Sequence, residues 1–121
     1  MRAHLMAAAA VVLSIGAAHA DPFESAYGNT VTTTLPDGSK QVAYVNRDGT
    51  WEQHEADGMV IKGTFVWKGE RTACFTIVDP TPKDASKATH CHDIAGDHKL
   101  GETWSETDNG QTFTMAITAG R

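Results

Sequence analysis

Turn-forming pairs that end in glycine divide the chain into short segments, and they constrain its fold more than any other feature. They are Asp-Gly at 37–38, 48–49 and 57–58, Lys-Gly at 68–69 and Asn-Gly at 109–110. Asp-Gly and Asn-Gly supply the positive φ angles that tight β-hairpins require. The segments between them are short, β-branched and partly alternating, and no stretch has a helical period long enough to cover a sheet face. The sequence therefore predicts an all-β fold.

Eight segments have the composition of strands. They are residues 29–35, 41–45, 50–55, 59–67, 72–78, 88–94, 102–106 and 111–118. Consecutive hairpins of this kind form an antiparallel meander, which closes into a small barrel or makes two packed sheets, a sandwich. The stretch "DPFES" at 21–25 predicts one helical turn before the first strand. Residues 79–87, "DPTPKDASK", are the one long loop.

The first twenty residues have the pattern of an export signal. Arg2 precedes an apolar, alanine-rich run from Leu5 to Ala18, and Ala18-His19-Ala20 matches the small-x-small cleavage motif. About 14 apolar residues are fewer than the roughly 20 that span a bilayer. We therefore predict a signal peptide over 1–20, cleavage after Ala20, and a single domain over 21–121 with no membrane span. The mature chain is expected in the periplasm or outside the cell.

The charge balance restricts the partners of the mature chain. Without Arg2 the sequence has 9 Lys and Arg against 15 Asp and Glu, a formal charge of −6, with no basic cluster. Nucleic acids and anionic membranes both need a positive surface on the protein that binds them. This balance excludes them as expected partners and leaves a small ligand or another protein.

Both cysteines follow the predicted cleavage site, and an even count in an exported chain favours a disulfide between Cys74 and Cys91. We next assume that they face each other across two antiparallel strands. The opposed residues are then Thr76 with Thr89 and Thr72 with Asp93 on the disulfide's face, and Phe75 with His90 and Ala73 with His92 on the other. His90 and His92 are therefore expected on the inward face.

Three interpretations of the histidines remain. In the favoured one, they are structural residues with a hydrogen-bond partner or with solvent around them. In the second, His90 and His92 bind zinc or copper, with His98, Asp97 or His54 completing the ligands. In the third, His54 or His92 acts as a general base beside Glu52 or Asp93, but no nucleophile is placed to complete such a site. We therefore expect no catalytic residue and no resident cofactor other than this zinc or copper.

Side-chain alternation predicts which residues form the interior. One inward row holds Met59, Ile61, Phe65 and Trp67, and another holds Phe113, Met115 and Ile117. A two-residue Asn-Gly loop places Trp104 opposite Met115.

The length of the loop at 57–58 decides which side chains of residues 50–55 point inward. A loop of two residues turns Glu52 and His54 inward, whereas a loop of three residues turns Trp51 inward. We favour Trp51 because burying an indole gains more free energy.

These assignments give a first hypothesis, a non-enzymatic binding or envelope module. An open interior lined by Trp67, Phe65, Met115 and Trp104 is expected to bind a small apolar ligand. If side chains fill that interior, a role in binding a protein or in the envelope structure remains. The alternative is a zinc- or copper-binding protein that uses His90 and His92.

The run "DPFESAYGNTV", the segment "GTFVWKGERTACFTIVDPTP", the second cysteine and the closing "ITAGR" resemble short exported two-cysteine proteins of Gram-negative bacteria that have no assigned activity. The resemblance covers nearly all of residues 21–121. It implies a β fold and an exported location, and it carries over no site residue. The Gly-Thr-aromatic strand is also similar to strands of lipocalin-like and avidin-like barrels, which is an analogy of fold alone.

Overall fold

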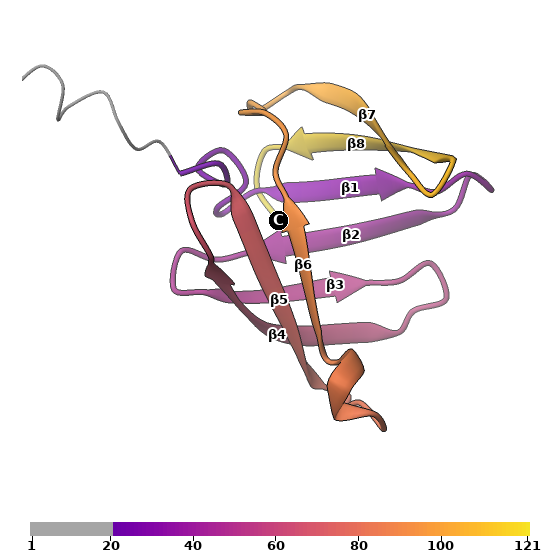
Figure 1. Ribbon diagram of the computed structural model, residues 1–121. Coiled ribbons are helices and arrows are strands. Elements are labelled where there is room, and N and C mark those ends of the chain that lie inside the picture. The colour runs from indigo at the N-terminus through magenta and orange to yellow at the C-terminus, as the bar shows by residue number, and fades with distance from the viewer. Residues whose placement is uncertain (1–20) are drawn as a thin grey trace, which may run out of the picture.

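A computed structural model describes residues 21–121, and the predicted signal peptide lies outside the described residues. The chain forms eight strands and one short 3-10 helix, η1 (Figure 1). They are β1 (Thr30–Thr34), β2 (Lys40–Val45), β3 (Thr50–His54), β4 (Val60–Trp67), β5 (Thr72–Asp79), η1 (Ala85–Lys87), β6 (Thr89–Asp93), β7 (Thr103–Asp108) and β8 (Gln111–Thr118). The prediction of an all-β fold is confirmed.

The strands form one antiparallel sheet in the order β6-β5-β4-β3-β2-β1-β8-β7. Hairpins join β1 through β5, the loop that holds η1 leads into β6, and a further hairpin returns the chain from β7 to β8, which pairs with β1. The sheet curls into a half-barrel, and β6 and β7 are its two free edges (Figure 1). The predicted meander is confirmed in this open form. A nine-residue connection over 94–102 separates the two edge strands instead of a tight hairpin.

The hairpin loops differ in length, and this decides which side chains point inward. The Asn-Gly loop has two residues, since Asp108 pairs with Gln111, and both Asn109 and Gly110 have positive φ angles. The loop at 56–58 has three, since the Glu55 N–H donates to the Met59 carbonyl at 2.8 Å. The extra residue turns Trp51 inward, as we favoured.

We call the face of the sheet that carries Phe65 the concave face and the opposite one the convex face. Phe65, Val45 and Ala26 are buried at the centre of the core. A run of turns over 21–28 inserts Phe23 at one end of the half-barrel. Its ring centroid lies 4.7 Å from that of Trp67 and 5.5 Å from that of Phe65. The predicted N-terminal turn therefore closes one end of the interior.

The Asp21 carboxylate stabilises this turn. It accepts hydrogen bonds from the Phe23 N–H at 2.8 Å and from the Tyr27 hydroxyl at 2.7 Å. Burial, followed by the hydrogen bond to Asp21, raises the pKa of Tyr27 above its ordinary value, so the phenol stays protonated and keeps donating.

One predicted core residue is wrong. Met59 lies just before β4, at the end of a hairpin, and 49% of its surface is exposed. It precedes the first residue of β4, Val60, so the alternation of that strand does not apply to it. On the convex face Val66 and Val78 are also exposed.

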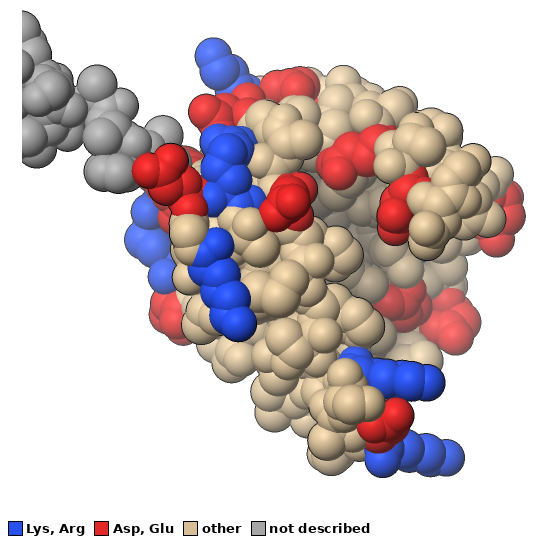
Figure 2. Space-filling view, viewed as in Figure 1, with Lys and Arg blue, Asp and Glu red and all other residues tan. Residues whose placement is uncertain are grey.

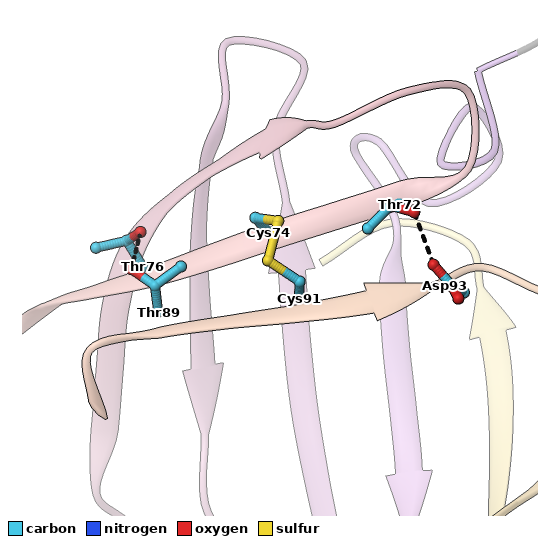
Figure 3. The surroundings of a disulfide bond; sticks show 6 residues. All are labelled: Thr72, Cys74, Thr76, Thr89, Cys91 and Asp93. Atoms are coloured by element: carbon cyan, nitrogen blue, oxygen red, sulfur yellow. Dashed lines mark hydrogen bonds between the residues drawn. A yellow bond between two sulfur atoms is a disulfide. The ribbon is translucent and has the colours of Figure 1, made fainter. Parts of the chain in front are cut away.

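The disulfide joins Cys74 of β5 to Cys91 of β6, and the predicted register around it is confirmed (Figure 3). The Thr76 and Thr89 hydroxyls lie 2.9 Å apart, and the Thr72 hydroxyl donates to the Asp93 carboxylate at 2.6 Å. These side chains lie on the convex face. A disulfide of this kind is typical of proteins that fold in an oxidising compartment.

Candidate functional site

A cavity of about 100 Å³ opens on the concave face, between the N-terminal turn and the connection from β6 to β7. Its walls come from six parts of the chain and are mainly apolar. The lining residues are Pro22, Phe23, Ala26, Val31, Val45, Ile94, Ala95, His98, Trp104, Glu106, Met115 and Ile117. We call this space the concave pocket.

Strand register places the back wall of the concave pocket. Ile117 of β8 lies opposite Val31 of β1, and Met115 lies opposite Trp104 of β7. Directly opposed residues in an antiparallel pair point to the same face of the sheet. The four apolar side chains therefore line one continuous surface, which ends at the free edge of β7.

Trp104 is held by two contacts at the mouth of the pocket. Its ring stacks on the His98 ring with centroids 3.6 Å apart and planes 5° from parallel. Its indole N–H donates to the Glu106 carboxylate at 2.8 Å. The indole is therefore fixed before any ligand arrives, which lowers the entropic cost of binding.

The His98 side chain is itself fixed by Glu102. His98 Nδ1 lies 2.6 Å from one Glu102 carboxylate oxygen, and the Lys99 N–H donates to the other at 3.0 Å. The His98 hydrogen bond, more than the Lys99 one, lowers the pKa of Glu102 below its ordinary value. These bonds order the connection between β6 and β7 on one side of the pocket.

Arg71 orders the start of the same connection. Its Nε donates to the Ile94 carbonyl at 2.7 Å, and its Nη1 donates to the Asp97 carboxylate at 3.0 Å. Its Nη2 is buried and has no hydrogen-bond partner among residues 21–121. A buried donor without a partner is costly, so a water or a ligand acceptor at this nitrogen would lower the free energy.

Acidic side chains lie around the hollow of the half-barrel (Figure 2). Figure 2 shows a hollow between the front strands and the β7–β8 hairpin, with Asp and Glu side chains at several points on its border. Glu106 is the acidic residue that lines the concave pocket itself. The pocket thus combines apolar walls with one carboxylate, that of Glu106.

The structure divides the four predicted ligand-binding residues into two pairs. Met115 and Trp104 line the concave pocket, whereas Phe65 and Trp67 lie in the core cluster under Phe23. Sequence reasoning missed Phe23, Ile94 and His98 as wall residues. Phe23 lies in the predicted turn, which was the available signal, while the connection over 94–102 has no periodicity that indicates where its side chains point.

The predicted metal ligands do not gather into one site. His90 and His92 lie on the concave face of β6, whereas His54 lies on the convex face, where its Nε2 is 2.5 Å from a Glu52 oxygen. His98 is bonded to Glu102. Within residues 21–121, no group of three or more His, Cys, Asp or Glu side chains is arranged to hold a metal ion.

Comparison of the chain with protein-family models, curated proteins and solved structures found no match. In the part of the chain that the structure describes, no helix is long and apolar enough to cross a bilayer.

Proposed function

We propose that this chain is a non-enzymatic binding module of the periplasm or the extracellular space, and that its concave pocket receives one apolar side chain of a partner protein. The observation that carries the proposal is the preformed pocket of about 100 Å³ beside a free strand edge. Pockets for drug-sized ligands have roughly 300–1,000 Å³. A volume of about 100 Å³ suits one side chain or a short alkyl group.

The β7 edge supports an extended partner segment. β7 pairs only with β8, so one side of its backbone is available for hydrogen bonding. Addition of a strand to a free edge gives affinity through the main chain, while a pocket for an alternate side chain gives specificity. Because Glu106 borders the pocket, a basic residue next to the apolar one in the partner is favoured.

The test is a selection of random displayed peptides on the mature chain, followed by calorimetry with the purified peptides. We expect enriched peptides with one apolar residue next to a basic one. The Ala95→Leu variant, which fills the pocket wall, is expected to weaken binding at least about tenfold, equivalent to about 1.4 kcal/mol. Ala119→Leu is the matched control, because Ala119 is exposed and does not line the pocket.

A second arm uses 1-hexanol, a small neutral ligand with a short alkyl chain, in a displacement assay with an environment-sensitive dye. Binding of 1-hexanol with no enriched peptide would replace the protein partner by a small ligand. No binding in either arm, or equal binding by the Ala95→Leu variant and the control, contradicts the proposal.

A further inference from the structure

The β6 strand has features that the concave pocket does not use. It is a free edge of the sheet, and all five of its residues are exposed. His90 and His92 lie two positions apart on its concave face. Among residues 21–121, neither imidazole has a hydrogen-bond or ion-pair partner, and His92 contacts the Phe75 ring at 6.2 Å between centroids. Two imidazoles on one face of a strand form half of a tetrahedral zinc site.

We propose that two copies of this chain pair through their β6 edges, antiparallel and centred on Cys91, and that the four imidazoles of His90 and His92 from both copies bind one divalent zinc or copper ion. One chain supplies only two ligands, so the site is incomplete without the second copy. This inference goes beyond the proposed function, because it uses the other edge of the sheet and a different ligand.

Hydrogen-bond alternation along β6 fits this pairing. The Ile77 N–H donates to the Ala88 carbonyl and the Ile94 N–H donates to the Arg71 carbonyl, both at 2.8 Å. Backbone groups in an antiparallel strand alternate between its two sides. Ala88, His90, His92 and Ile94 therefore direct their backbone groups toward β5. Thr89, Cys91 and Asp93 direct theirs to the free edge, where a second strand can bind them.

The same alternation brings the imidazoles together. With Cys91 opposite the partner's Cys91, backbone hydrogen bonds link these two residues. His90 then lies opposite the partner's His92 in a pair without backbone hydrogen bonds. Such pairs have the closer side chains, with Cα atoms about 4.5 Å apart. Two pairs of this kind on one face bring four imidazoles close enough to bind a common ion.

The charges along β6 are compatible with self-pairing. Thr89 lies opposite the partner's Asp93, so no two like charges face each other directly within the strand. Residues 21–121 of each copy carry a formal charge of −6, and this like charge opposes association of the two copies. A divalent cation between the two edges reduces that repulsion. We therefore expect the pairing to depend on the metal.

The first experiment measures the mass of the mature chain by sedimentation velocity with zinc chloride or copper chloride alone, and again after EDTA. We expect a doubled mass at one metal per two chains, and return to the monomer with EDTA. In the His90→Ala/His92→Ala variant, the association constant for metal-dependent pairing is expected to fall at least about tenfold. The His54→Ala variant is the matched control, since His54 lies on the convex face.

The second experiment tests the register with charges at Thr89, a position exposed at the free edge. Thr89→Glu places a carboxylate opposite the partner's Asp93 at two symmetric positions, and we expect weaker pairing at equal metal concentration. Thr89→Lys places an opposite charge there, and we expect pairing to be kept or strengthened. Both variants keep the four histidines, so they separate this pairing from nonspecific precipitation by metal.

Three results overturn the proposal. The first is metal binding at one ion per chain with no change of mass. The second is pairing that survives in the His90→Ala/His92→Ala variant. The third is an equal effect of Thr89→Glu and Thr89→Lys.

Discussion

Trp51 lies directly opposite Gly63 across β3 and β4, and its indole covers the place where a side chain at residue 63 would lie. A Cβ atom built on Gly63 would be 2.9 Å from the indole nitrogen and 1.9 Å from the Thr76 carbonyl oxygen. The indole N–H donates to the Thr64 carbonyl at 2.9 Å, which fixes the ring in this position. The core at this point therefore requires a residue without a side chain.

We expect Gly63→Ala to lower the free energy of unfolding by about 1–3 kcal/mol, because overpacking forces the backbone or the indole to move. Urea unfolding followed by tryptophan fluorescence measures the loss. Gly96→Ala is the matched control, since its added Cβ would meet only His98 ring atoms at 3.6 Å and 3.7 Å. Equal stability of the two variants would show that Gly63 is replaceable.

The sequence predicted most of this fold because its signals were local. The Asn-Gly pair fixed the register of Trp104 against Met115, and the two cysteines fixed that of β5 against β6. The sequence could not predict that β6 and β7 remain unpaired and that the sheet therefore does not close into a barrel. Pairing of these two strands depends on the path of the connection over 94–102, which has neither a tight-turn signal nor periodicity.

The concave pocket was predicted only in part, because the sequence indicates its local features and not its long-range contacts. Met115 and Trp104 follow from strand alternation, which is a local property. Phe23 covers Phe65 and Trp67 through a contact between residues more than forty positions apart, and no local pattern encodes it. Long-range packing therefore decides that Met115 and Trp104 line the concave pocket, whereas Phe65 and Trp67 are part of the core.

Reduction of the disulfide is expected to lower the free energy of unfolding by about 3 kcal/mol, since Cys74 and Cys91 close a loop over a separation of 17 residues. β6 pairs with one neighbour only, so it should lose protection first. Hydrogen exchange with and without reductant measures this, with the central β1–β2 hairpin as the internal reference. Unchanged protection over Thr89–Asp93 would contradict the prediction.

Arg121 hydrogen-bonds to the residue before β1, to the last residue of β2 and to the residue after it. Its Nη1 donates to the Asn46 side-chain carbonyl at 2.6 Å, its Nη2 to the Val45 carbonyl at 2.7 Å and its Nε to the Asn29 carbonyl at 3.2 Å. Its guanidinium also lies 5.1 Å from the Tyr44 ring centroid.

We expect Arg121→Ala to cost about 1–3 kcal/mol of stability, because hydrogen bonds from a charged donor are among the stronger ones. Arg121→Lys should not restore the loss, since an ammonium group cannot reproduce the planar donor geometry. Lys83→Ala is the control, because it removes one positive charge at an exposed loop position, where a substitution usually changes stability by less than about 0.5 kcal/mol. Differential scanning calorimetry compares the three variants, and equal melting temperatures for Arg121→Ala and Lys83→Ala would contradict the role of Arg121.

Acid should destabilise the chain through its turn carboxylates. Hydrogen bonds from the Ser39, Thr50 and Ser86 side chains, and then from their backbone N–H groups, lower the pKa of Asp37, Asp48 and Asp84 below the ordinary 3.8. A carboxyl group whose pKa is lower in the folded state contributes stability above its unfolded pKa, and this contribution is lost as the pH falls through its folded pKa.

We expect the melting temperature to be nearly constant from pH 7 to about 5 and to decrease below about pH 4. An Asp37→Asn/Asp48→Asn/Asp84→Asn variant retains an acceptor oxygen at each turn but no titrating group, so its acid decline should be shallower. An identical decline in that variant would assign acid sensitivity to other carboxylates.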